Sequence, residues 1–104
     1  MPKKTTNTTT RIQFAVFIPE ETPITQLNMG KRATNGLSRN GIMTVGGIMD
    51  NWLDLGELRS IGVDTVKEIR AAVFAYNLAL IWDDDEKMHR FAESIDWWKE
   101  RAAS

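Results

Sequence analysis

Two similar segments of the chain each combine a glycine that can stop a helix with a threonine that can start one. GIMTVGGI spans residues 41–48, and GVDTVKEI spans residues 62–69. Both have Gly first, a branched apolar residue second, Thr-Val at the fourth and fifth positions, and Ile last. Glycine adopts the left-handed conformation that ends many helices, and threonine accepts a hydrogen bond from the first free amides of the next helix. Five matching positions can also arise by chance, so the flanking residues decide what the match means.

The residues around the first segment have the spacing of short helices separated by tight turns. Apolar side chains at four-residue spacing within residues 28–40 indicate a helix that ends at Gly41. Thr44 can then cap a short helix that runs to residue 49 or 50. Residues 53–59 form another short helical turn in this interpretation, and Gly62 ends it.

The second segment precedes the longest helix that the sequence indicates, VKEIRAAVFAY, residues 66–76. Thr65 and Glu68 have the spacing of a capping box, in which a hydroxyl and a carboxylate each accept from one free amide. Such a cap stabilises a helix by about 1 kcal/mol. Asn77 is predicted to close this helix in the left-handed conformation.

Both segments therefore predict one local structure, that of a helix–hairpin–helix turn. A helix stops at Gly41 or Gly62, an apolar side chain (Ile42 or Val63) enters the core, and a new helix begins. The free amides at the new N-terminus favour an anion such as phosphate. A small all-helical protein with no ligand turns its backbone in the same way, so the turn alone does not assign a function.

We predict an all-α fold: a compact bundle of four to five short helices with helix–hairpin–helix-like turns, plus an added C-terminal amphipathic helix. The predicted domain covers residues 24–80, a flexible or extended N-terminal arm covers residues 1–23, and the added helix covers residues 81–104. The predicted core consists of Leu27, Leu37, Ile42, Val45, Ile48, Leu55, Leu58, Ile61, Val66, Ile69, Val73 and Leu78.

The two ends of the protein differ in character. MPKKTTNTTT is polar and is typical of a disordered segment, whereas the apolar alternation in residues 11–18 fits a strand or an extended arm lying on the core. In the last segment, Met88, Phe91, Ile95 and Trp98 form one apolar helix face. That face either docks on the bundle or contacts a partner, and docking is the simpler interpretation.

The composition argues against several classes of protein. Cysteine is absent, which excludes disulfides and thiolate metal sites. No apolar run approaches the roughly 18 residues of a membrane helix, and the first residues do not resemble a signal peptide. We therefore expect a cytoplasmic protein with no membrane contact.

The sequence also gives no support for an enzyme. His89 is the only histidine, and on an exposed helix face it is a solvated residue more often than a base. The acidic run of residues 83–86 is interpreted as N-terminal helix charge rather than as a metal site. Phosphate-loop and nucleophile motifs are absent. We expect no catalytic residue, no metal and no cofactor.

The order and spacing of these motifs resemble the C-terminal domain of the bacterial RNA polymerase alpha subunit. The resemblance covers residues 24–80, and although no single motif is specific, the series is. The residues that carry it are Ile24 and Leu27, Arg32 and Asn35, Gly41-Ile42 with Thr44-Val45, Leu55 and Leu58, Ile61-Gly62 with Thr65, Glu68-Ile69, and Asn77-Leu78 with Leu80.

The resemblance implies a compact helical domain that binds the minor groove of AT-rich DNA and contacts RNA polymerase, sigma factors or other regulators. The DNA-binding residues that it implies are Arg32, Asn35, Gly36, Gly62, Thr65 and Glu68. Arg32 would enter the minor groove, which attracts a guanidinium where it is narrow. Gly62 and Thr65 would offer amides and a hydroxyl to phosphate, and Glu68 would orient its neighbours.

Two features depart from the family. Asp64 stands where the family usually has lysine, and a carboxylate there repels phosphate. The sequence also lacks the large assembly domain of a polymerase subunit, so we expect a free-standing relative.

The charge balance leaves two functions open. The net charge is −1, and residues 77–104 carry four basic and seven acidic residues, so any basic surface is local. One function is a module that binds AT-rich DNA weakly. The other is a protein-interaction module that kept the fold and lost the groove contacts. The sequence does not specify the preferred DNA sequence, the protein partner or the oligomeric state.

Overall fold

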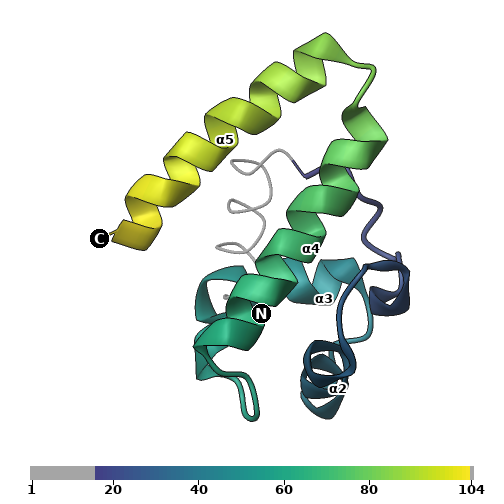
Figure 1. Cartoon of the computed structure of the whole chain (residues 1–104), viewed down its shortest axis with the longest axis vertical. Helices are drawn as coiled ribbons and strands as arrows, with labels where there is room; N and C mark the ends of the chain where they lie inside the picture. Colours follow the sequence, from purple (N-terminus) through teal and green to yellow (C-terminus); the bar gives the residue numbers. More distant parts are fainter. Residues whose placement is uncertain (1–15, 104) are drawn as a thin grey trace.

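The computed structural model describes the backbone of residues 16–103 and the side chains of residues 16–94 (Figure 1). In chain order, the helices are the 3-10 helix η1 (Ile24–Gln26), α2 (Lys31–Arg39), α3 (Val45–Asp50), the 3-10 helix η2 (Trp52–Glu57), α4 (Val63–Ile81) and α5 (Asp85–Ala103). Within these residues, β pairing is limited to an isolated bridge between Pro23 and Thr44. The predicted all-α class is confirmed.

The turn after α2 has the predicted structure. Gly41 follows the helix with a φ of 75°, a conformation that glycine adopts without steric cost. Ile42 is buried, and the Thr44 hydroxyl accepts a hydrogen bond from the Gly47 N–H at 3.2 Å. Thr44 is therefore the N-cap of α3, which begins at Val45.

The turn before α4 differs from its prediction. Gly62, not Thr65, is the N-cap, and the Val66 N–H donates to the Gly62 carbonyl at 2.9 Å to close a first turn that begins earlier than expected. Thr65 is consequently inside the helix and buried, and α4 has no side-chain cap at this end. Val63, predicted to enter the core, is 71% exposed. The predictions of a Thr65 cap and of a buried Val63 were wrong. The residues of α4 that pack on the core determine how the helix is rotated about its axis, and the buried face includes Thr65 but not Val63.

Two polar residues of α4 hold distant segments of the protein. Glu68, assigned to the capping box, accepts through Oε2 from the Gly30 N–H at 2.6 Å. Asn77, predicted to end the helix, is buried within it, and its Oδ1 accepts from the Phe17 N–H at 2.7 Å. The prediction for Asn77 was wrong because the following Leu-Ala-Leu-Ile sequence favours the helix, which continues to Ile81.

One hydrophobic core joins the arm before η1 to the helices from η1 to α4. All of the predicted core side chains are buried except Leu58 and Leu78, which are partly buried. Phe91, predicted to pack through the C-terminal helix, is also buried, and the buried apolar residues that were not in the predicted core are Ile18, Ile24, Ala33, Met49, Trp52, Ala72 and Ile81.

The C-terminal helix folds back from the end of α4 (Figure 1). Phe91 is buried, and its ring centroid lies 5.8 Å from that of Phe74 on α4. The predicted contacts of Ile95 and Trp98 lie outside the described side chains, as do the predictions for residues 1–15. No helix in residues 16–103 combines the length and the apolar content needed to span a bilayer.

Candidate nucleic-acid interface

The first turn of α2 carries two exposed basic side chains, Lys31 and Arg32. Gly30 is the N-cap in an extended conformation and offers no side chain to the free amides of this turn. A helix N-terminus has partial positive charge, so a cation here is unfavourable by roughly 0.3–1 kcal/mol. The turn therefore carries two exposed cations beside free amides, offset in part by the Glu68 carboxylate that accepts from the Gly30 N–H, and it can attract a further anion such as phosphate.

The next turn of α2 contains Asn35 and Gly36. Asn35 is exposed, whereas Gly36 is buried against the loop that leads into α4. A Cβ atom on Gly36 would lie 3.2 Å from Ile61 Cγ1 and 3.4 Å from the Ser60 carbonyl oxygen. Gly36 thus permits the second half of α2 to approach closely the loop that leads into α4.

The start of α4 has free amides and one acidic side chain. Gly62 is extended (φ −95°, ψ −178°), and the N–H groups of residues 63–65 have no acceptor within the helix. Asp64 is exposed in this turn, where the helix dipole favours a carboxylate. Thr65 is 5% exposed, so it contributes its backbone amide to this turn and not a surface hydroxyl.

Side-chain hydrogen bonds connect α2 to α4 and to the loop before it. The bond from the Gly30 N–H to Glu68 Oε2 brings a carboxylate to the N-terminus of α2. At the other end of α2, Asn40 Nδ2 donates to the carbonyl oxygens of Gly36 and Arg59, each at 2.8 Å. Lys31 and Arg32 therefore lie on a helix whose two ends are both bonded to α4 or to the loop before it.

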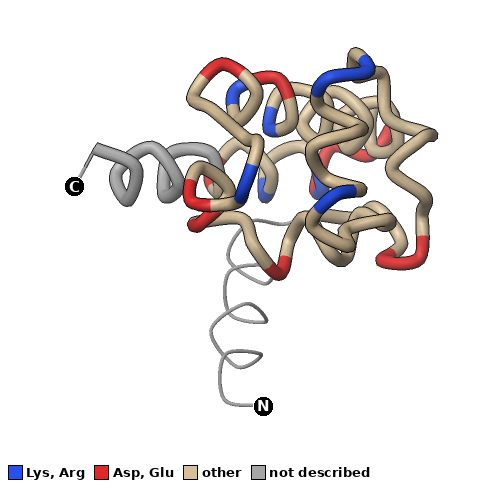
Figure 2. Tube along the Cα trace, turned by 90° about the horizontal axis from the view of Figure 1, so that it is seen from below, with Lys and Arg blue, Asp and Glu red and all other residues tan. Residues whose placement is uncertain are grey.

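Charge is mixed over the rest of the molecule. Figure 2 shows basic and acidic positions interspersed over the described residues, and residues 28–76 contain six basic and five acidic residues. Arg70 serves the structure: its Nη2 donates to the Trp52 carbonyl at 2.7 Å, and its guanidinium lies 5.5 Å from the Trp52 ring centroid. Desolvation by burial lowers the pKa of Arg70 below its usual value. A nucleic-acid contact would be local to the starts of α2 and α4.

Lys31 was not among the predicted site residues. The predicted helix began at residue 28, which placed Lys31 inside it, whereas the helix begins at Lys31 itself. The sequence signal that could have pointed to Lys31 is a glycine followed by two adjacent basic residues. Cations are unfavourable at a helix start because of the helix dipole, so two of them together suggest a role in binding.

The acidic start of α5 has a structural role. Asp84 Oδ1 accepts from the Lys87 N–H at 3.0 Å, which is N-cap geometry. His89 is exposed, with Nε2 3.7 Å from Glu93 Oε2 one turn along. Among the described residues, no group of three or more His, Cys, Asp or Glu side chains is placed to hold a metal ion.

Comparison with known protein families gave a match to the C-terminal domain of the alpha chain of bacterial RNA polymerase. The model of this family matches residues 19–74, more than half of the protein. The matched range includes the starts of both α2 and α4. In comparisons with curated proteins and with solved structures, no match was found.

Proposed function

The protein belongs to the family of the C-terminal domain of the bacterial RNA polymerase alpha subunit, and from this premise we propose that it binds AT-rich DNA weakly as part of transcription. The observation that carries the proposal is the exposed pair Lys31 and Arg32 in the first turn of α2. Cations in a turn that already has positive potential favour a strongly anionic ligand.

In this proposal, the two helix starts have different tasks. Arg32 inserts into the minor groove, whose negative potential is greatest in narrow A-tracts, and Asn35 lies beside it. The free amides that follow Gly62, including that of Thr65, bind backbone phosphate. Gly36 lets α2 approach the loop before α4 at Ile61, and Glu68 joins the start of α2 to α4 through the bond to Gly30.

Asp64 sets the strength of this binding. Its carboxylate is exposed in the turn that offers amides to phosphate, and it stands among several favourable contacts. It weakens the interaction without abolishing it. The expected dissociation constant is in the range of non-specific complexes, about 10⁻⁴–10⁻⁶ M.

A protein-interaction module on the same fold is the second candidate. The observation that favours it is again Asp64, because a carboxylate occupies the turn where a phosphate would bind. Its partner would be RNA polymerase, a sigma factor or another regulator.

Fluorescence anisotropy with labelled AT-rich and GC-rich duplexes, measured over a series of salt concentrations, tests the proposal. Arg32→Ala should remove most binding to the AT-rich duplex, whereas Arg39→Ala should retain it because Arg39 lies at the opposite end of α2. Asp64→Lys should strengthen binding and steepen the log–log salt dependence by roughly one to two units.

Absence of binding by both the wild type and Asp64→Lys at low salt would show that the DNA proposal is wrong. The protein-interaction function would then replace it. Amide chemical-shift titrations with RNA polymerase and with sigma factor would identify the face that such a partner uses.

A further inference from the structure

The outer side of α4 carries four apolar residues in a row, which we call the outer stripe. They follow one another at spacings of four, three and four residues, which places them on one side of the helix: Ala71, Ala75, Leu78 and Trp82. Trp82 keeps helical backbone angles as the C-cap, so the stripe continues to it. The two alanines are exposed, Leu78 is partly buried and Trp82 is 66% exposed.

The core of the protein uses a different side of the same helix. That side consists of buried residues that include Val66, Ile69, Val73 and Asn77. Residues 71–82 contain no charged side chain, so the outer side of this part of α4 is as free of charge as the inner side. The outer face of a surface helix normally carries charged residues, and a helix that is apolar all round is normally covered all round. The outer stripe therefore indicates a face that packs against another surface.

The helix that follows α4 leaves this face open. α5 contacts α4 through Phe91 and Phe74, whose ring centroids lie 5.8 Å apart, and Phe74 is not part of the outer stripe. Figure 1 shows α5 diverging from α4 toward the N-terminal half of α4. The exposure of Ala71 and Ala75 agrees with that divergence.

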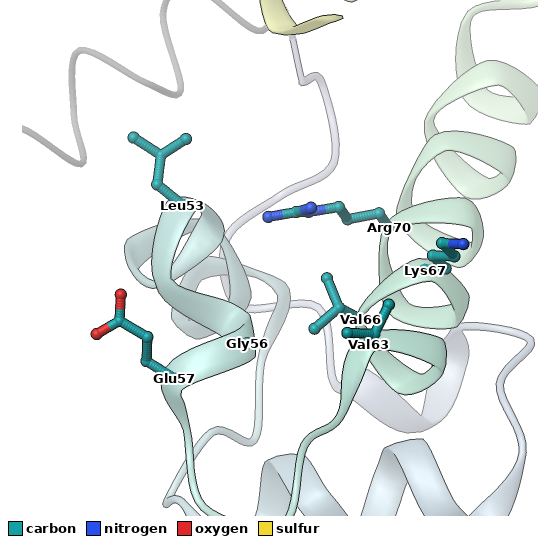
Figure 3. A pocket seen from close by; sticks show the side chains of 7 residues that line it. All are labelled: Leu53, Gly56, Glu57, Val63, Val66, Lys67 and Arg70. Carbon is teal, nitrogen blue, oxygen red and sulfur yellow. The ribbon is translucent and has the colours of Figure 1, made fainter. Parts of the chain in front are cut away.

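A groove between η2 and α4 is a separate uncovered surface. It encloses about 380 Å³, and its lining includes Leu53, Glu57, Val66, Lys67 and Arg70. Figure 3 shows Val66 and Arg70 pointing from α4 toward η2, with Lys67 at the edge of the groove. This lining mixes both signs of charge with apolar side chains and does not select one occupant. Leu53, which is 49% exposed, supplies a control position away from the outer stripe.

The spacing of the outer stripe favours another helix as its partner. Alternating steps of four and three residues average about 3.5, the repeat with which two helices pack side by side along a seam. The distance between packed helices depends on the side chains at the contact, and alanine at two of the four positions allows a close approach.

The order of side chains along the stripe makes it complementary to itself in an antiparallel pair. The two small residues come first and the two large residues come last. If two copies align antiparallel about the point between residues 76 and 77, Trp82 of each copy lies opposite Ala71 of the other. Leu78 then lies opposite Ala75. Large side chains facing small ones fill a seam, whereas a parallel pair would set Trp82 against Trp82 and alanine against alanine.

Charge at the two ends of the stripe agrees with the antiparallel arrangement. Lys67 is exposed one turn before Ala71, and Asp83 is exposed directly after Trp82. In the antiparallel pair, Lys67 of each copy comes beside Asp83 of the other, so the favourable contact occurs twice. A parallel pair would bring lysine to lysine and aspartate to aspartate, which is repulsive.

We infer that the outer stripe is the contact surface between two copies of this protein, paired antiparallel along α4 about a two-fold axis. Such an interface uses the same residues from both copies, as two-fold symmetry requires. The stripe is short, so the association is weak and the dimer fraction rises with protein concentration. The inference does not depend on DNA binding, because every measurement below is made without DNA.

Sedimentation velocity of the full-length protein over a concentration series tests the inference. The sedimentation coefficient of the wild type should rise with concentration toward that of a dimer. Ala75→Glu places a charge in the middle of the seam and should weaken association by about tenfold or more. A melting temperature of dilute Ala75→Glu equal to that of dilute wild type would show that the loss comes from the interface and not from unfolding.

Two controls separate the outer stripe from other exposed apolar surface. Leu80→Glu introduces the same charge on the same helix, but Leu80 is two residues from both Leu78 and Trp82 and therefore lies about half a turn away from the stripe. Leu80 is 51% exposed, so the substitution is tolerated. Leu53→Gln changes the groove instead. Both variants should associate as the wild type does.

Charge reversal tests the antiparallel register. Lys67→Glu should weaken association because it sets two carboxylates beside each other at each end of the seam. Adding Asp83→Lys to this variant should restore association, because the opposite charges then meet again with their positions exchanged. In a parallel pair, Lys67→Glu would exchange one like-charged contact for another, and the second substitution would restore nothing.

Wild-type protein that stays monomeric up to about 1 mM would overturn the inference. It would also be overturned if Leu53→Gln or Leu80→Glu abolished association while Ala75→Glu preserved it, because the copies would then meet through another surface. Failure of Asp83→Lys to rescue Lys67→Glu would overturn the antiparallel pairing.

Discussion

At the scale of single residues, the backbone at Gly41 is the clearest constraint. Its φ of 75° is unfavourable for any residue with a Cβ atom, although a Cβ there would meet nothing within 4 Å. Gly41→Ala should lower the free energy of unfolding by about 1–2 kcal/mol through backbone strain alone. Gly56→Ala is the control, because Gly56 has a negative φ and its added Cβ would make only an ordinary contact with Val66 Cγ2 at 3.8 Å. Urea denaturation that shows equal losses for both variants would contradict this account.

Glu68 is a second residue whose role is distinguishable by substitution. Glu68→Ala removes the acceptor of the Gly30 N–H and should destabilise the protein by about 1 kcal/mol, with faster hydrogen exchange at Gly30. Glu57→Ala removes an equally charged but exposed side chain and should change stability by less than about 0.5 kcal/mol. If Gly30 exchanges at the same rate in wild type and Glu68→Ala, the bond does not fix the start of α2 in solution.

At the scale of elements, the two repeated segments show how far local sequence patterns can predict structure. In the first segment, Gly41 ends a helix, Ile42 is buried in the core and Thr44 caps the next helix, as the pattern predicts. In the second, the same letters begin the helix at Val63 and place Thr65 inside it. A local pattern shows which caps a segment can form. How α4 is rotated about its axis depends on which of its side chains pack against the rest of the core.

The candidate site shows the same division between local and long-range information. The family resemblance implied Arg32 and Asn35 as site residues, and the structure places both on the surface of α2. The pattern and the resemblance did not identify Lys31, because the helix start was misplaced, and they gave Thr65 a surface hydroxyl that the structure buries. Side-chain exposure at a helix start depends on where that helix begins, which short motifs predict poorly.

The attachment of α5 leads to a prediction at this scale. Phe91 is 5% exposed and contacts Phe74, which in turn lies edge-on to Trp52 at 5.8 Å between ring centroids. Phe91→Ala should therefore lower the free energy of unfolding by about 3 kcal/mol, toward the low end for buried phenylalanine. His89→Ala, on the exposed side of α5, should change it by less than about 0.5 kcal/mol. Thermal unfolding with no difference between the two variants would indicate that α5 is not docked through Phe91.

At the scale of the whole molecule, three of the side-chain hydrogen bonds between remote described segments position α2 and the arm against the rest of the fold. They connect Glu68 to Gly30, Asn77 to Phe17, and Asn40 to Arg59. The local sequence assigned Glu68 to a capping box and Asn77 to a helix end, and it gave no role to Asn40. These bonds determine how α2, the arm and α4 are positioned, and the helix–hairpin–helix pattern alone does not contain them.

Asp64 couples the stability of the whole domain to its proposed binding. An acidic side chain in the first turn of α4 stabilises the helix by about 0.3–1 kcal/mol, and the same charge repels phosphate at the free amides. Asp64→Asn should therefore lose part of that stability and gain some DNA affinity, and Asp64→Lys should go further in both directions. Urea denaturation and DNA titration of the same samples measure the two effects.

A matched substitution separates this local effect from a change in net charge. Asp83→Lys makes the same change in charge at an exposed position between α4 and α5, which is at the opposite end of α4 from Asp64. At about 0.1 M salt, screening acts over about 10 Å, so this variant should leave DNA affinity nearly unchanged. If Asp64→Lys and Asp83→Lys strengthened binding equally, the gain would come from overall charge, and the start of α4 would not be where phosphate binds. If only Asp64→Lys strengthened binding, and the variant was also less stable, then the carboxylate that stabilises α4 would be the same group that limits its affinity for DNA.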